Sequence, residues 1–171
     1  MVGWLLAMVA AVAAQRLAEL VLAARNRCWL LVRGAREHGA GHYPLFIILH
    51  VCWLTGWLAE GLARGGGPGA AWPLWLGLFL AAQSLRYWCI VTLGRRWNTR
   101  ILVLPGAPPV RRGPYRFLRH PNYLAVSAEL LCGPLIFGAW GTALAAGAAN
   151  AWLLLAVRIP AEEDALTRST Q

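Results

Sequence analysis

The chain has 171 residues, of which 58% are hydrophobic and only 13% are charged. Soluble domains carry about 25% charged residues, so the composition argues against a soluble protein and indicates a single integral membrane domain over residues 1–171. The net charge is +9, and all sixteen basic residues are arginine. No solvated basic face alternates with polar residues, however, so we expect no nucleic-acid partner.

Five apolar stretches predict helices that cross a membrane, because each approaches the roughly 20 residues that a crossing helix needs. They cover residues 2–23, 43–62, 72–94, 122–138 and 141–157. The joint between the last two is too short for a domain, so these two should form a tight helical hairpin. We therefore predict an all-α polytopic bundle of five transmembrane helices.

The arginines predict how the bundle is oriented. Segments 24–42 and 95–121 together hold eleven arginines, whereas the opposite side holds only Arg64. Positive residues gather on the cytoplasmic side of membrane proteins. The N-terminus is therefore expected outside, and the C-terminal tail in the cytoplasm.

Several ionisable side chains fall inside the apolar stretches, where charges are costly and are usually paired or functional. These charged residues are Arg16, Glu19, Arg86, Glu129 and Arg158. The sequence places all of them in the cytoplasmic half of the membrane, and His50 lies at a similar depth. Purely structural pairs, Arg16 with Glu19 and Arg86 with Glu129, are one interpretation. The convergence of charges from four helices favours another, a polar cavity open to the cytoplasm.

Residues 95–121 form the longest segment outside the apolar stretches. It holds a β-branched run around Ile101, a Pro-Gly turn and the sequence "PPV". These features predict an extended arm or a small hairpin that folds back over the bundle.

The arm ends in "GPYRFLRHPNY", residues 113–123. A residue before proline disfavours the helical conformation, so His120 should be extended or a helix cap. Pro121 suits the first helical position. The free N–H groups of Asn122, Tyr123 and Leu124 would then face the cytoplasmic mouth and favour an anionic group. The alternative is an ordinary helix start with an interfacial arginine and tyrosine.

The C-terminal "RIPAEED" is the second unusual stretch, with Arg158 after an apolar run and then Glu162 and Glu163. The glutamates could neutralise the arginine-rich arm or bind the cationic end of a ligand. The four cysteines form no CxxC pair and predict neither a disulfide framework nor a metal site.

These motifs together resemble the isoprenylcysteine carboxyl methyltransferase family of integral membrane methyltransferases. The resemblance rests on "RHPNY" at 119–123, Glu129, a hydrophobic hairpin, and then Arg158 with Glu162–Glu163, and it covers about 113–166. The N-terminal part resembles the small bacterial branch of the family, whose members are linked to methylation of lipid-tailed polyketide phenols and pyrones.

The resemblance implies S-adenosylmethionine as the cofactor, bound at the cytoplasmic face of a bacterial plasma membrane protein. The cofactor-binding residues that it implies are Tyr115, His120, Pro121, Asn122, Tyr123, Glu162 and Glu163. Arg119 and Arg158 would face the polar end of the substrate or the cofactor carboxylate. A lipophilic small molecule would enter between the helices from the membrane lipid.

The acceptor decides whether a base is needed. A carboxylate arrives ionised and needs only an arginine to orient it, whereas a phenol must lose a proton. Candidate bases are His50, His120, Glu129 and Glu19, and the expected catalytic residues are Arg119, Arg158, Glu129 and His50. The chain lacks the extra N-terminal helices of the eukaryotic enzymes, so a small amphiphile is the better substrate. The alternatives are a phospholipid amine N-methyltransferase and a non-catalytic lipid-binding membrane protein.

Overall fold

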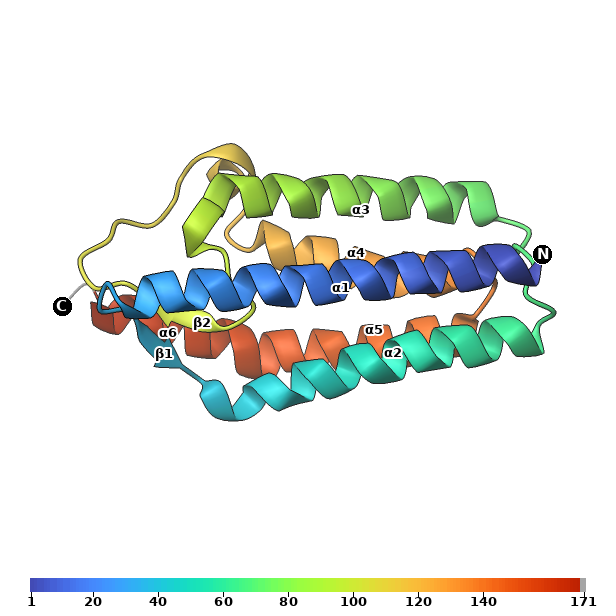
Figure 1. Ribbon diagram of the computed structural model, residues 1–171, viewed down its shortest axis with the longest axis horizontal. Coiled ribbons are helices and arrows are strands. Elements are labelled where there is room, and N and C mark those ends of the chain that lie inside the picture. The colour runs from blue at the N-terminus through green and yellow to red at the C-terminus, as the bar shows by residue number, and fades with distance from the viewer. Residues whose placement is uncertain (170–171) are drawn as a thin grey trace.

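The computed structural model describes residues 1–169 and is a bundle of long, roughly parallel helices (Figure 1). The N-terminus lies at one end of the bundle, and both strands and the last helix lie at the other. The predicted all-α class is confirmed. The helices are α1 (Val2–Leu31), α2 (Tyr43–Ala63), α3 (Trp72–Leu93), α4 (Pro121–Leu135), α5 (Trp140–Trp152) and α6 (Ile159–Ser169).

Four helical segments of the described chain are long and apolar enough to cross a membrane. They are Val2–Leu31, Ala40–Ala63, Trp72–Arg96 and Trp140–Arg168. Helix α4 occupies the remaining predicted stretch, but it has only 15 residues and is therefore about 22 Å long, against about 30 Å of hydrocarbon. The count of five membrane crossings remains a prediction.

The last span is longer than the sequence predicted. After α5 the chain continues through a π-helical segment, η4 (Leu153–Arg158), directly into α6. Wider helical turns of this kind are rare and often occur at functional sites. Here the π-helical segment ends on Arg158, a side chain that is only 6% exposed.

Two short strands tie the arm to the loop between α1 and α2. Strand β1 (Arg36–His38) pairs antiparallel with β2 (Ile101–Val103). The β-branched run therefore does form a strand, but its partner lies in the other arginine-rich loop rather than in the arm itself. The buried side chains of Ile101 and Val103 pack on Ala165 of α6.

The core draws buried side chains from all of α1 to α5, and two tryptophans of α2 in it are almost wholly buried. Pro134 has no N–H, which frees the carbonyl of Leu130 one turn earlier from its helical bond. The indole Nε1 of Trp53 donates to that carbonyl at 3.0 Å. A Cβ at Gly133 would lie only 3.1 Å from the ring of Trp57, so glycine there permits the close approach.

Candidate functional site

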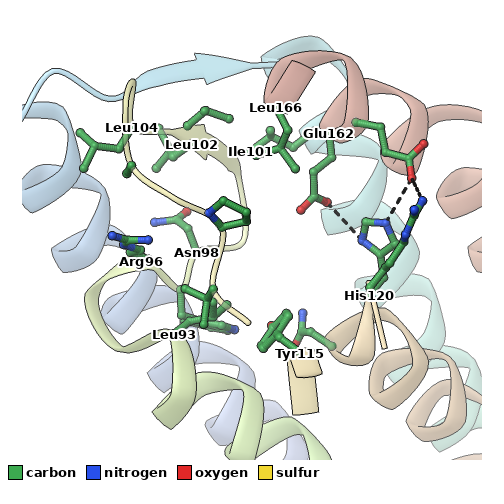
Figure 2. A pocket seen from close by; sticks show the side chains of 18 of the residues that line it. Leu93, Arg96, Asn98, Ile101, Leu102, Leu104, Tyr115, His120, Glu162 and Leu166 are labelled. Carbon is green, nitrogen blue, oxygen red and sulfur yellow. Dashed lines mark ion pairs between the residues drawn. The ribbon is translucent and has the colours of Figure 1, made fainter. Parts of the chain in front are cut away.

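A cavity of about 650 Å³ lies at the end of the bundle that carries the strands and α6 (Figure 2). Its lining comes mainly from residues 96–111 of the arm, residues 115–123 and residues 158–167. Figure 2 shows His120 on one side of the cavity and Asn98 on the other. Segments far apart in the sequence therefore build one site.

The segment that begins "GPY" is shaped by a glycine. Gly113 has φ +56°, and a Cβ there would lie 2.4 Å from the Thr92 hydroxyl oxygen, so another residue would be strained in conformation and in space. The short helical turn η3 (Gly113–Arg116) follows, with Pro114 buried. Tyr115 then lines the cavity. Burial raises the pKa of Tyr115, so its hydroxyl stays protonated.

Helix α4 begins at Pro121, with His120 as its N-cap, as the sequence predicts. The expectation of three free N–H groups was wrong for two of them. The N–H groups of Tyr123 and Leu124 donate to the His120 carbonyl at 3.1 and 3.3 Å. Of the three N–H groups, only that of Asn122 has no backbone partner among residues 1–169. The anion site at this helix end is thus reduced to one N–H group.

Helix α6 brings two carboxylates to the start of α4. The imidazole Nδ1 of His120 lies 3.9 Å from Glu162 Oε2, and its Nε2 lies 3.7 Å from Glu163 Oε1. The exposed Arg119 guanidinium lies 3.9 Å from the same Glu163 oxygen. Figure 2 shows these three ion pairs as dashed lines.

Tyr123 connects the two sequence motifs directly. Its hydroxyl donates a hydrogen bond to Glu162 and accepts one from Arg158 Nε at 3.0 Å. Its ring stacks on His120 with 5.3 Å between ring centroids. Arg158 also donates from Nη2 to the carbonyl of Thr99, at 3.0 Å, so the arm is held to the same cluster.

Three buried polar atoms of residues that line the cavity have no hydrogen-bond partner in the described chain: Trp97 Nε1, His120 Nε2 and Asn122 Oδ1. Buried polar atoms are nearly always satisfied, and exceptions call for an explanation. All three are closed off from solvent, so a ligand in the cavity reaches them only when neighbouring side chains move.

Known proteins resemble this chain in sequence. The profile of the isoprenylcysteine carboxyl methyltransferase (ICMT) family matches residues 75–168, which include both motifs of the site. The chain belongs to this family. It is 40% identical over 163 residues to the uncharacterized protein YpbQ of Bacillus subtilis, covering 95% of both chains. It is 29% identical over 159 residues to an uncharacterized protein of Haemophilus influenzae, covering 92% of both. No solved structure gives a significant match.

Most of the site residues expected from the sequence lie together. The cavity is lined by Tyr115, Arg119, His120, Asn122, Tyr123, Arg158, Glu162 and Glu163. Pro121 is buried against the bundle and does not reach the cavity. Glu129 and His50 also lie outside its lining.

The five charged residues inside the apolar stretches do not share the one polar cavity that the sequence predicts. Four of them pair with one another between α1, α3 and α4: Arg16, Glu19, Arg86 and Glu129. Arg16 bridges Glu19, at 2.9 Å, and Glu129, while Arg86 donates twice to Glu19, at 2.6 and 2.8 Å. Both predicted pairs, Arg16–Glu19 and Arg86–Glu129, are therefore present. Only Arg158, of the five charges, lines the cavity.

His50 lies apart from the cavity as well. Its ring Nδ1 is 2.8 Å from the carbonyl of Phe46 one turn earlier, and its ring contacts Trp53 edge-on. These are the contacts of a packed histidine in a helix.

The sequence did not identify the wall that the arm contributes. Asn98, Arg100 and Leu102 line the cavity, and Figure 2 shows Asn98 and Leu102 on the side away from His120. The fold-back of the arm was predicted, but not its register. That register depends on the pairing of β2 with β1, which leaves no local signal in the sequence.

Proposed function

We propose that the protein is an S-adenosylmethionine-dependent methyltransferase that acts on an oxygen of a lipophilic small molecule. The observation that carries the proposal is the cavity in which the "RHPNY" segment and the Glu162–Glu163 pair meet, in a member of a methyltransferase family.

The residues of the cavity suit this cofactor, which carries a carboxylate, an ammonium, a sulfonium and an adenine. Glu162 and Glu163 offer negative charge to the cationic groups, and Arg119 with the Asn122 N–H offers donors to the carboxylate. Trp97 Nε1, His120 Nε2 and Asn122 Oδ1, all from residues that line the cavity, are buried without hydrogen-bond partners in the described chain. The arm adds apolar surface, including Leu102, against which a flat base can pack.

The chemistry asks little of the protein beyond position. When bound, the cofactor supplies a methyl group on a sulfonium sulfur, which an acceptor oxygen takes by in-line displacement. Tyr123 and Arg158 hold Glu162 in place. Exposed Phe117 and Leu118 sit in the chain just before His120 and offer apolar surface beside the cavity for a lipophilic acceptor.

A phenol acceptor would need a base, and among the candidates the geometry favours His120. Among the described residues it is the one candidate base that lines the cavity. Glu19 and Glu129 accept hydrogen bonds from arginines inside the bundle, and neither lines the cavity. The ring of His50 faces the bundle instead of the cavity. Its role as a base remains a prediction.

The test is calorimetric titration of the purified protein in detergent with S-adenosylmethionine. The wild type should show saturable binding. Glu163→Gln should weaken binding about tenfold or more, since hydrogen bonds and ion pairs to charged groups contribute about 1.5–3 kcal/mol. Asp164→Asn is the matched control, because it removes the same charge from the neighbouring residue, which does not line the cavity.

Transfer of a labelled methyl group into a lipid extract then identifies the acceptor class. Label in an ester or aryl ether supports the proposal, and label in a phospholipid amine supports N-methylation instead. No saturable binding by the wild type would leave a non-catalytic lipid-binding protein as the better interpretation.

A further inference from the structure

A second cavity, of about 540 Å³, lies between α1 and α3. It is lined by Leu22, Arg25, Asn26, Trp29, Ile90, Gly94 and Arg95. None of these residues lines the candidate active site, so this groove, hereafter the α1–α3 groove, needs an explanation of its own.

The α1–α3 groove carries positive charge without a matching carboxylate. Arg25 and Arg95 are exposed, and within residues 1–169 neither side chain has an ion pair or a hydrogen bond. Arg27, by contrast, is paired with Glu37. The guanidinium of Arg95 lies 5.7 Å from the ring centroid of Trp29, which also carries a second arginine on its face. The groove therefore presents two uncompensated guanidinium groups beside an indole.

The α1–α3 groove also lies at the depth of a membrane surface. Both α1 and α3 belong to segments apolar enough to cross a membrane, and Arg25 and Arg95 follow directly on their apolar runs. Leu22 and Ile90 line the side toward the middle of the bundle, and Val91, next to Ile90, is 77% exposed. Tryptophan and arginine together are typical of the boundary between hydrocarbon and headgroups.

We propose that the α1–α3 groove binds an anionic phospholipid, with its phosphate between Arg25 and Arg95 and an acyl chain along Leu22 and Ile90. Guanidinium groups bind phosphate through paired N–H donors. Basic pockets between membrane helices are known to hold anionic headgroups. The apolar lining favours a lipid over free phosphate, because only the hydrocarbon chain of a lipid can cover the apolar side chains. The proposal does not depend on methyl transfer.

Native mass spectrometry of the full chain in detergent tests this, with phosphatidylglycerol as the probe and phosphatidylcholine as the zwitterionic comparison. An arginine near an anionic membrane surface changes affinity about fivefold, so Arg25→Gln with Arg95→Gln should weaken phosphatidylglycerol binding about 25-fold. The matched control is Arg36→Gln with Arg116→Gln. It removes the same charge from exposed positions outside the groove, and it should bind as the wild type does.

A third variant, Leu22→Trp, fills the groove and keeps both arginines, so it should also lose the bound lipid. It decides the question if the double arginine variant fails to fold. The proposal is overturned by equal binding of the two lipids, by equal loss in the two double variants, or by unchanged binding in Leu22→Trp. Displacement of the lipid by millimolar inorganic phosphate would indicate a free-phosphate site and overturn it too.

Discussion

Tyr123 is the residue through which the two motifs of the candidate site support each other. Its hydroxyl bonds to Glu162 and to Arg158, and Arg158 is held in turn by the Thr99 carbonyl. One side chain at the start of α4 thus fixes a carboxylate from α6 and an arginine from η4. This geometry predicts that the hydroxyl matters for stability and for the cofactor alike.

We expect Tyr123→Phe to lower the free energy of unfolding by about 1–3 kcal/mol, because buried partners lose their hydrogen bonds. Binding of S-adenosylmethionine should weaken as Glu162 becomes free to move. Thermal unfolding and calorimetric titration measure the two effects. Tyr87→Phe is the control, since Tyr87 is exposed on α3. Unchanged stability and binding in Tyr123→Phe would contradict this account.

Glu129 sits at the centre of the charge network, with a side chain that is fully buried. It is paired with both Arg16 and Arg86. Removing one member of a buried pair leaves an uncompensated charge and costs about 3–5 kcal/mol. Replacing both members of a pair with apolar residues can be nearly neutral.

Glu129→Leu should therefore be strongly destabilising, whereas Glu129→Leu combined with Arg86→Met should recover part of the loss. The double variant leaves Arg16 and Glu19 as a neutral pair. Thermal unfolding of the wild type, both single variants and the double variant measures the coupling. Additive losses would indicate that the network has no mutual dependence.

At the scale of elements, the strand pair β1–β2 fixes the arm over the bundle. Glu37 on β1 accepts hydrogen bonds from Arg27 on α1 and from Arg100, next to β2. The Arg100 guanidinium lies 4.0 Å above the ring of Tyr43 and lines the cavity. The carboxylate of Glu37 therefore links α1, the β1–β2 sheet and a residue of the candidate site.

Burial of Glu37 acts to raise its pKa, but the hydrogen bonds from Arg100 and Arg27 outweigh burial and lower it below the ordinary value. A lowered pKa in the folded state stabilises the protein above the unfolded pKa of about 4.3. That contribution is lost as the pH falls through the lowered value. The melting temperature of the wild type should thus fall more than that of Glu37→Gln between pH 6 and acid conditions.

Thermal unfolding in detergent at a series of pH values measures this difference. Asp164→Asn serves as the control and should follow the wild type, because Asp164 makes only an exposed local pair with Arg168. Parallel pH profiles for the wild type and Glu37→Gln would refute the role of Glu37.

At the scale of the whole molecule, α1, α2, α3, α4 and the continuous α5–η4–α6 segment run along the bundle. Within residues 1–169, four segments have the length and composition of a membrane span. The short pass is α4, which begins at the cavity and runs back toward the end that holds the N-terminus (Figure 1). The start of α4, with His120 and Tyr123, contacts Glu162 and Glu163 of α6.

If α4 crosses the membrane, the loop between α2 and α3 and the C-terminus lie on opposite sides. A green fluorescent protein fused after residue 171 should fluoresce, since it folds only in the cytoplasm. Alkaline phosphatase fused within residues 64–71 should be active, since it requires the outside. In the control, the two reporter proteins exchange positions. The green fluorescent protein should then not fluoresce, and the alkaline phosphatase should be inactive. A loop and a C-terminus on the same side would show that only four segments cross.

The sequence by itself determined the helices, because apolar runs of about 20 residues leave few alternatives to a membrane bundle. It located Pro121 at the start of α4, since proline and the residue before it restrict the backbone locally. It also indicated two motifs that belong to one family, and the family match confirms that membership.

Only the tertiary structure decided which charges meet. Arg16, Glu19, Arg86 and Glu129 are similar in depth to Arg158, yet they satisfy one another inside the bundle while Arg158 turns toward the cavity. Depth in the sequence gives the height of a residue along a helix but not the direction in which it faces. Other features likewise depend on the tertiary structure. They are the pairing of β1 with β2, the two hydrogen bonds that the His120 carbonyl accepts, and the α1–α3 groove.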